Sequence, residues 1–424
     1  MHPSVSSTTL DAARQCFMDG LAHLAAQRPA EAEAQFEASL RLVPGRVSTL
    51  LNLAAARLAL GRADAAQDAA SQVLSAEPDN AEAWFHRANA EAMRQRTDAA
   101  LRAFERAAAL APGSAHPWFR HGQVLQGLGR DAQALPSYER AVVADPAFAP
   151  AWTNLGTLLR EQGRAADAAH AFRRARAHGA DDELHGYYLA AVGAGAAPPA
   201  APALYVETLF DDYAEGFAGH VVDVLDYRAH RVLARALSAV APGRTFARAL
   251  DLGCGTGLCG ALLRPVVGHL SGVDLSGRML AQAEAGGAYD ALARQDVVEF
   301  LRAAPPSSLD LVTAADVFIY VGDLSAAFEA VSRVLAEAGV FAFSVELAAR
   351  GTVSFALQAS LRYAHSEAYL RDLARRHGLD VRHVERGAVR RDQGRPIEGL
   401  FMLLTVAGSA PAADAASGSA AGGA

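Results

Sequence analysis

Four prolines in the first third of the chain stand at a constant interval. They are 34 residues apart, at Pro44, Pro78, Pro112 and Pro146. The tryptophans keep the same phase, at Trp84, Trp118 and Trp152. A period of this length predicts identical supersecondary units that bury their apolar faces only by stacking on one another.

Two further columns follow this period. Small residues recur at Gly20, Ala54, Ala88, Gly122 and Gly156, and aromatic residues at Phe36, Phe104, Tyr138 and Phe172. The pattern resembles the tetratricopeptide repeat, which implies an all-α solenoid over residues 1–180. In this register five helical hairpins begin near Ala13, Val47, Ala81, Ala115 and Ala149.

A repeat array of this kind offers a concave surface of first-helix side chains. One column of that surface consists of residues able to hydrogen-bond an extended peptide, namely Asn52, His86, Arg120 and Asn154. It predicts a protein or peptide partner in the groove. A polar face without any ligand explains the column equally well, because repeat surfaces are polar by default.

The chain changes character after the repeats. Ala180 stands where the next proline would fall, and Glu183 to Val192 is typical of a capping helix. Gly193 to Ala203 is rich in Ala, Gly and Pro and predicts a linker of mixed stiffness, so residues 181–203 are assigned to the capping helix and linker. Residues 408–424 are small and polar and predict a disordered tail.

A second informative feature is the run ALDLGCGTG from Ala249 to Gly257. Its apolar first part predicts a buried strand, and apolar residues at helical spacing from Leu258 to Val267 predict a helix that Gly268 stops. The glycines between them let the backbone approach a nucleotide-like ligand closely. Strand, glycine turn and helix are therefore in register.

This run resembles motif I of the S-adenosylmethionine-dependent methyltransferases of the doubly wound α/β type. A dinucleotide fingerprint on Gly255, Gly257 and Gly260 fits less well, because it begins two residues past the strand end. The resemblance implies a class I methyltransferase domain over residues 204–407 with a seven-stranded, mostly parallel sheet. Six apolar runs supply the other strands: Leu270–Leu275, Tyr289–Ala293, Ser308–Val317, Gly339–Glu346, Leu379–Val389 and Gly399–Val406.

The resemblance also assigns residues to the cofactor, S-adenosylmethionine. Asp251 precedes the loop formed by Gly253, Gly255 and Gly257. Asp274, with Leu275 beside it, ends the next strand, where the family's acid binds the ribose hydroxyls. Met279 would lie against the adenine, and Asp296 and Val297 would bind its edge. Met279 as a core residue and Asp296 as a helix N-cap are the alternatives.

An aromatic stretch from Tyr205 to Phe217, which includes Tyr213, lies upstream of the glycine run. It resembles the N-terminal lid of many small-molecule methyltransferases, although ordinary core packing would give the same spacing. Together with Asp226, Tyr227 and Arg228 it resembles a bacterial subfamily that joins tetratricopeptide repeats to a class I methyltransferase domain.

Candidate residues for the methyl acceptor follow the fourth and fifth strands. In the family the fourth strand ends near the reacting methyl group, so Asp316 and Tyr320 are candidate catalytic residues; Asp323 is better explained as an N-cap. In the later segment His365 is a candidate base, and Arg362 and Tyr363 are candidate substrate-binding residues. Alternatively, His365 only flanks a helix capped by Ser366.

Composition narrows the function further. The net charge of −7 argues against a nucleic-acid surface, and no apolar run is long enough to predict a membrane span. Three cysteines are too few for a disulfide framework or a zinc site, so no metal is expected. Without a pattern typical of a secretory signal, the expected location is cytoplasmic.

The sequence therefore predicts an enzyme that methylates a small molecule or a protein delivered by the repeats. The alternative is an interaction scaffold whose methyltransferase domain binds the cofactor without catalysis. The acceptor itself is not encoded in any motif.

Overall fold

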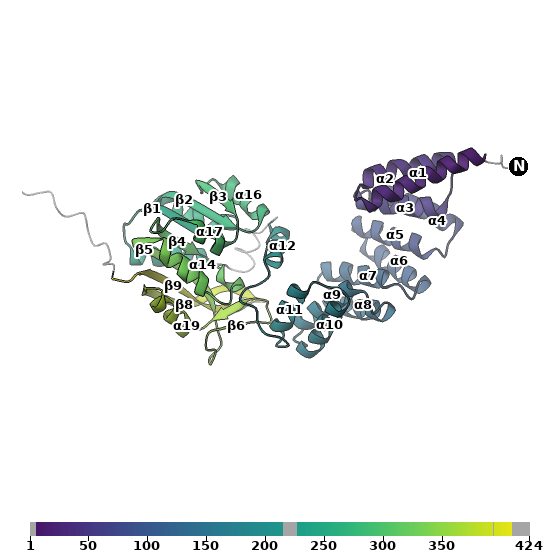
Figure 1. The fold of residues 1–424 in the computed structure, drawn as a ribbon. Helices are drawn as coiled ribbons and strands as arrows, with labels where there is room; N and C mark the ends of the chain where they lie inside the picture. The colour runs from purple at the N-terminus through teal and green to yellow at the C-terminus, as the bar shows by residue number, and fades with distance from the viewer. Residues whose placement is uncertain (1–5, 215–226, 393, 409–424) are drawn as a thin grey trace, which may run out of the picture. The chain divides into compact units, whose positions relative to one another are not determined.

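The computed structural model describes residues 6–214, 227–392 and 394–408 (Figure 1). By internal contacts the chain divides into two compact units, Met1–Asp181 and Asp182–Ala424. The predicted tail, the lid residues 215–217 and Asp226 lie outside the described residues. Within the described part, no helix combines the length and apolarity needed to cross a membrane.

The described part of the first unit is built from helices alone, paired as hairpins α1–α2, α3–α4, α5–α6, α7–α8 and α9–α10. Their bounds are α1 Ser7–Ala25, α2 Pro29–Leu42, α3 Val47–Ala59, α4 Ala63–Ala76, α5 Ala81–Met93, α6 Thr97–Leu110, α7 Ala115–Gly127, α8 Asp131–Ala144, α9 Ala149–Glu161 and α10 Ala165–Ala177. Four of the five predicted starts agree with the structure. The first hairpin begins earlier than predicted, because Ser6 caps α1 by accepting a hydrogen bond from the Thr9 amide.

The shared phase of proline and tryptophan has a direct cause. The indole Nε1 of Trp84 donates to the carbonyl of Pro78 at 2.8 Å, and that of Trp152 donates to the carbonyl of Pro146 at 2.9 Å. Each indole thereby satisfies a carbonyl in the turn before its own helix. The proline and the tryptophan act as one unit of the repeat.

The small and aromatic columns meet inside the hairpins. A Cβ added to Gly122 would lie 2.7 Å from the Tyr138 ring, and one added to Gly156 would lie 2.6 Å from the Phe172 ring. Both rings are completely buried. Glycine is therefore needed because it lets the helix backbone touch the ring of the partner helix.

The predicted peptide-binding column is largely engaged within the first unit. Asn52 donates to the Ser48 carbonyl at 2.8 Å, Arg120 donates to Asn89 at 3.1 Å, and Asn154 donates to the Tyr138 hydroxyl at 3.1 Å. His86 is buried, with Nε2 at 3.6 Å from Glu82. Binding of a peptide by this column stays a prediction.

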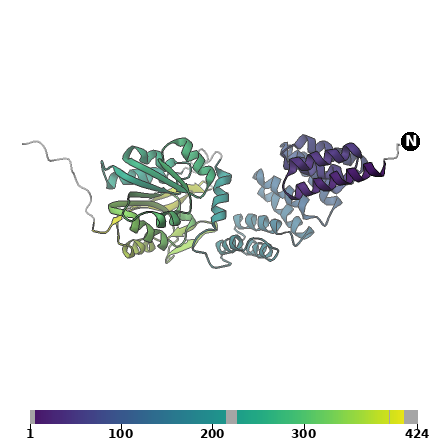
Figure 2. The same cartoon turned by 45° about the horizontal axis from the view of Figure 1, so that its top comes forward.

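The second unit is an α/β domain around one mixed sheet (Figures 1 and 2). The strands are β1 Phe246–Leu252, β2 Val267–Asp274, β3 Ala291–Arg294, β4 Leu309–Ala314, β5 Leu335–Leu347, β6 Phe355–Leu357, β7 Tyr363–His365, β8 Leu379–Asp392 and β9 Arg395–Val406. The core order β3-β2-β1-β4-β5 is parallel, and β9 then pairs antiparallel with β5 and β8. All seven predicted strands are present.

Two short strands were not predicted. β6 and β7 form an antiparallel hairpin, and β7 adds to the end of β5 through Glu346 and Leu347. With three residues each, these strands are too short to show a period of two. They extend the sheet beside the carboxyl end of β5.

Helices cover both faces of the sheet. The bounds are α11 Asp182–Ala191, α12 Ala203–Tyr213, α14 Ala229–Val240, α15 Leu258–Leu263, η2 Arg264–Val266, α16 Gly277–Gly286, α17 Val297–Ala303, η3 Phe318–Tyr320, α18 Ser325–Val334 and α19 Glu367–Arg376. One core layer lies under α17, α18 and α19 and contains Phe328, Phe341 and Phe343. The other lies under α14 and α15 and contains Leu233 and Phe401. Three layers result.

The helix predicted to reach Val267 is shorter. Regular helix ends at Leu263, Arg264–Val266 forms a 3₁₀ turn, and Val267 already pairs with Phe246 as the first residue of β2. Pro265 lacks the amide that a continuing helix would need. The apolar residues predicted to form the last helical turn instead open a strand.

The predicted linker also needs correction. The Pro199 carbonyl accepts hydrogen bonds from the Gly322 and Asp323 amides at 2.8 and 2.9 Å, and the Ala201 amide donates to the Tyr320 carbonyl at 2.8 Å. Before it, Tyr187 of α11 donates to the Leu361 carbonyl at 2.6 Å. These residues belong to the second unit, because the Pro199 and Ala201 backbone and the Tyr187 hydroxyl pair with the loops after β4 and β6.

We expect Gly122→Ala to lower the free energy of unfolding of the repeats by about 1–3 kcal/mol, because the added methyl group overlaps the Tyr138 ring. Gly127→Ala on the same helix meets no atom within 4 Å and should stabilise the repeats by about 0.5–1 kcal/mol. Urea unfolding followed by tryptophan fluorescence measures both, since the three tryptophans lie in this unit. Equal effects of the two variants would contradict this packing.

Candidate active site

A cavity of about 430 Å³ lies in the second unit at the carboxyl ends of β1, β2 and β4. The loops that follow these strands line it, together with α12 and the start of α14. Ligands of open α/β sheets bind at this edge, and the volume suits a small molecule. This cavity is therefore the candidate active site.

The loop after β1 has a conformation that requires glycine. Gly253, Gly255 and Gly257 have positive φ angles of 57°, 53° and 92°. A Cβ at Gly253 would also lie 2.5 Å from Val317. Gly253 and Gly255 line the cavity, whereas Gly257 precedes α15 and lies against Tyr289. The backbone of the first two glycines is thus open to a ligand.

Asp251, at the end of β1, is almost completely buried, with 1% of its surface exposed. Oδ1 accepts a hydrogen bond from the Thr313 hydroxyl at 2.6 Å, and Oδ2 accepts one from the Tyr289 hydroxyl at 2.7 Å. Burial raises the pKa of Asp251 to about 6, although these hydrogen bonds oppose the rise. The carboxyl group joins β1 to β4 and to the residues before β3.

Asp274 ends β2 and holds the glycine loop in place. Its carboxylate accepts hydrogen bonds from the amides of Gly255 and Ser276, both at 2.9 Å. Burial raises the pKa of Asp274, while these backbone donors favour the ionised form. Asp274 and Leu275 both line the cavity, and each carboxylate oxygen can accept a further hydrogen bond.

Asp296 is the N-cap of α17, as one of its two predicted alternatives has it, while its contact with the adenine stays a prediction. Its Oδ1 caps α17 by accepting from the amides of Val298 and Glu299 at 2.9 and 3.0 Å. Asp296 and Val297 also line the cavity. Met279 is fully buried and is not among the described residues that line it, so the structure favours its role as a core residue.

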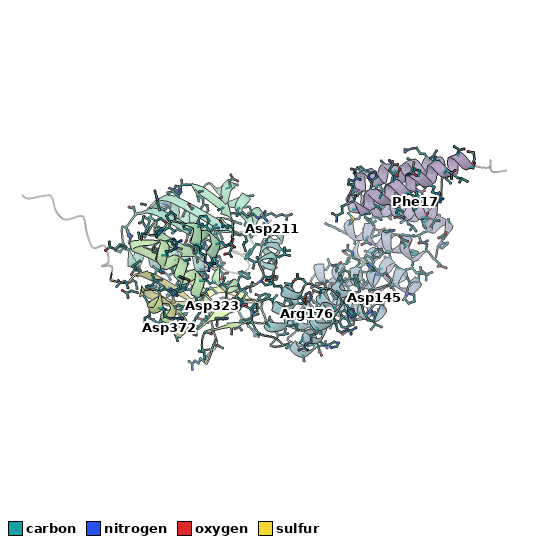
Figure 3. All side chains as sticks on the ribbon, viewed as in Figure 1. Phe17, Asp145, Arg176, Asp211, Asp323 and Asp372 are labelled. Atoms are coloured by element: carbon teal, nitrogen blue, oxygen red, sulfur yellow. The ribbon has the colours of Figure 1, made fainter. Side chains whose placement is uncertain are left out.

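Helix α12 is the described part of the predicted lid, and it closes one side of the cavity. Its lining residues are Tyr205, Val206, Leu209, Phe210 and Tyr213. Asp211, labelled in Figure 3, anchors the helix because its carboxylate accepts from the Ser276 hydroxyl at 2.5 Å. Glu207 pairs with Arg294 on the same side. An apolar wall thus faces the strand ends.

One polar atom in the loop after β1 has no hydrogen-bond partner in the part of the chain that the structure describes. Thr256 lines the cavity, and its hydroxyl is buried without a hydrogen bond. A buried hydroxyl of this kind is stabilised when a bound polar group supplies the missing hydrogen bond. Open glycine backbone, free carboxylate lone pairs and this hydroxyl fit a nucleoside-like cofactor.

Asp316 and Tyr320 both line the cavity beyond β4. Asp316 has a positive φ of 62°, and its amide donates to the Ser344 hydroxyl at 2.9 Å. Arg390 donates to both Asp316 carboxylate oxygens, at 2.9 and 3.0 Å, and also pairs with Glu346. Burial raises the pKa of Tyr320. The charge of the Asp316 carboxylate is therefore balanced by Arg390, which also holds the carboxylate in one orientation.

Of the three candidates in the segment after the fifth strand, Arg362, Tyr363 and His365, the structure brings Arg362 alone to the described cavity lining. His365 is fully buried, its Nε2 lies 3.0 Å from the Gly322 carbonyl, and burial lowers its pKa to about 4. Tyr363 donates to the Pro198 carbonyl at 2.7 Å. Because β7 pairs with β5, the side chains of Tyr363 and His365 are buried in the core and do not line the cavity. Asp323, labelled in Figure 3, accepts a hydrogen bond from the Ser325 amide at 3.0 Å. Because α18 begins at Ser325, one residue later than predicted, its N-cap is Leu324 and Asp323 lies just before it.

The lining residues that the sequence analysis did not assign to the site include Tyr227, His230, Thr256, Cys259 and Arg390. Arg390 lies on β8, more than 130 residues after the glycine run, and no local motif marks it. Tyr227 and His230 are three residues apart around the start of α14, and this helical spacing is the local pattern that indicates two neighbouring rings. Among the described residues, no group of three His, Cys, Asp or Glu could hold a metal ion.

Two family models match the chain. Residues 250–343 match a methyltransferase domain, and residues 51–115 and 119–183 match the tetratricopeptide repeat. The chain therefore carries repeats of a protein-interaction type and a methyltransferase domain, whose family implies S-adenosylmethionine as cofactor.

Individual proteins are similar to only part of this chain. A malonyl-[acyl-carrier protein] O-methyltransferase of Enterobacter lignolyticus is 34% identical over 122 residues, which are 28% of this chain, so the chain spans about half (48%) of that relative. The crystal structure of Burkholderia thailandensis 1,6-didemethyltoxoflavin-N1-methyltransferase is 22% identical, with 50% of this chain and 92% of that one covered and a TM-score of 0.39. A thermophilic repeat protein of Thermus thermophilus is 21% identical, with 40% and 93% covered and a TM-score of 0.36.

The pKa of Asp251 predicts how stability depends on pH. A folded pKa of about 6 exceeds the unfolded value, so the folded chain binds the extra proton and loses stability as pH rises from about 4 to about 6. The loss should approach roughly 3 kcal/mol. Asp251→Asn removes it, and the free energy of unfolding, followed by circular dichroism, should then change less over this range.

The matched control is Asp290→Asn. Donors from the Leu270 amide and Arg264 lower the pKa of Asp290, so this residue loses its contribution as pH falls, which is the opposite sign. If both variants shifted the pH profile in the same direction, the burial effect at Asp251 would be wrong.

Proposed function

We propose that this chain, which joins tetratricopeptide repeats to an S-adenosylmethionine-dependent methyltransferase domain of class EC 2.1.1, transfers a methyl group from that cofactor to an acceptor in the cavity. One observation carries the proposal. Gly253, Gly255, Asp274 and Asp296, from three successive strand ends, line a single cavity. The family motif assigns these same positions to the cofactor.

The residues present would hold the cofactor as follows. Backbone of the glycine loop approaches it closely, Asp274 accepts hydrogen bonds from the ribose hydroxyls, and Asp296 with the Val297 amide binds the adenine edge. The Thr256 hydroxyl supplies one further polar contact. When bound, the cofactor supplies a methyl group already activated on a sulfonium sulfur.

The remaining work of the protein is alignment and exclusion of water. Tyr205, Leu209 and Phe210 of α12 place an apolar wall opposite the strand ends, and Phe210 packs edge-on against Tyr320 at 5.5 Å. A dry, preformed wall fixes the acceptor relative to the methyl group, and positioning of this kind lowers the barrier to transfer.

Arg362 supports an acceptor that carries a negative charge. It lines the cavity, and no carboxylate oxygen of the described residues forms an ion pair with it. Arg390, by contrast, is already neutralised by Asp316 and Glu346. A carboxylate or phosphate on the acceptor would pair with Arg362, since a guanidinium matches the geometry of both groups. A small molecule of this class fits a cavity of about 430 Å³.

Cofactor binding is tested with Asp274→Ala in calorimetry with S-adenosylhomocysteine. We expect at least a tenfold weaker Kd, because hydrogen bonds to a charged group contribute about 1.5–3 kcal/mol. Asp290→Asn, which changes a carboxylate outside the cavity lining, should bind like the natural chain. Absence of binding to the natural chain would refute the proposal.

Acceptor class is tested by incubating the full chain with methyl-labelled S-adenosylmethionine and a cell extract. We expect label in the small-molecule filtrate, and at least tenfold less with Arg362→Met but not with Arg350→Met, whose arginine is exposed. Label confined to protein would instead support delivery of a protein by the repeats. Cofactor binding without any label would support the scaffold function.

A further inference from the structure

His230 is a buried polar residue of the cavity wall with a free ring nitrogen. It is the second residue of α14, and only 4% of its surface is exposed. Its Nδ1 is buried and has no hydrogen-bond partner among the described residues. The ring stacks on Tyr227, with centroids 5.1 Å apart and planes inclined by 20°. This stacking fixes the imidazole at the cavity wall.

The other described acid–base groups of the cavity are already engaged. Asp251 accepts from Thr313 and Tyr289, and Asp316 is paired by Arg390. Burial raises the pKa values of Tyr227, Tyr320 and Cys259, so these groups keep their protons at neutral pH. Unlike these groups, the ring Nδ1 of His230 has no hydrogen-bond partner among the described residues, so its lone pair is unshared when the ring hydrogen is on Nε2.

We propose that His230 Nδ1 accepts the proton of the methyl acceptor, so that the methylated atom is a hydroxyl oxygen or an N–H nitrogen and not a carboxylate. This inference rests on the proposed function and narrows its acceptor. Arg362 then holds an anionic group elsewhere on the same molecule, because a carboxylate that was itself methylated would carry no proton to remove.

The transfer step balances without a further reactant. The lone pair of the acceptor oxygen or nitrogen forms the new bond to the methyl carbon as the carbon–sulfur bond breaks, and the electrons of that bond stay on sulfur. The acceptor's O–H or N–H proton moves to His230, whose imidazole becomes an imidazolium. The positive charge of the sulfonium is thereby conserved, and the proton later passes to water.

The surroundings of His230 keep its ring neutral before the reaction. Burial, with a smaller effect of the Arg231 charge, lowers the pKa of His230 below its ordinary value. α14 packs against α15, β5, β8 and β9, of which β9 contributes the apolar Phe401 and Leu403. Titratable and charged groups around this wall are Tyr227, Arg231, Asp251, Cys259, Asp316, Glu346 and Arg390.

The state of His230 is tested by NMR on the full chain labelled at histidine and saturated with S-adenosylhomocysteine, with His230→Asn to assign the signal. We expect a neutral ring at pH 7 with its hydrogen on Nε2. An imidazolium at pH 7, or a hydrogen on Nδ1, would overturn the proposal. This result does not depend on turnover.

Its role is tested by labelled methyl transfer into the small-molecule filtrate of a cell extract. We expect His230→Asn, whose amide oxygen accepts a hydrogen bond but not a proton, to lower the rate about 100-fold or more, with the Kd for S-adenosylhomocysteine within about twofold. Imidazole should restore part of the rate of His230→Ala. His269→Gln, at an exposed histidine of β2, is the control.

A His230→Asn rate within about twofold of the natural chain would overturn the role of His230. If the natural chain binds S-adenosylhomocysteine but transfers no label, the proposed function fails, and the NMR result still decides whether His230 is a free base. The two failures are therefore distinct.

Discussion

The carboxyl group of Asp251 is the point on which the second unit depends. Its two oxygens accept hydrogen bonds from Thr313 on β4 and from Tyr289 before β3, so one buried side chain joins β1, which precedes the glycine loop, to two other segments of the second unit. The ring of Tyr289 then fills the space left by the missing Cβ atoms of Gly257, Gly260 and Gly272. Burial of the acid opposes folding, whereas these contacts give the loop one conformation.

Much of this architecture could be predicted because it repeats or is locally patterned. The 34-residue period predicted the helical hairpins. The apolar runs predicted seven strands, because a buried parallel strand consists of consecutive apolar residues. The glycine run marked a loop that lines the cavity, because the positive φ angles at Gly253 and Gly255 favour glycine. The ends of helices and strands were less predictable. The apolar Val267 is compatible with a helix and with a strand, and its pairing with Phe246 places it in β2.

The acceptor side was harder to predict because distant segments build it. Arg390 reaches the cavity only because β8 pairs with β9 and β9 pairs with β5, and a single sequence gives no measure of that register. Tyr363 and His365 were misplaced for the same reason, since pairing of β7 with β5 buries both side chains. His230 lacked a signal because a histidine near the start of an apolar helix is usual in a core.

The segment from α11 to Ala201 changes where this chain can be divided. Tyr187, Pro199 and Ala201 pair with the loops that carry Tyr320 and Arg362, so the strand ends are framed by residues that the sequence places beside the repeats. A catalytic fragment cut at residue 203 would leave those loop amides and carbonyls bare. Recombination that exchanged the repeats for another module would preserve the site only if the crossover fell before residue 182, at the boundary between the two compact units.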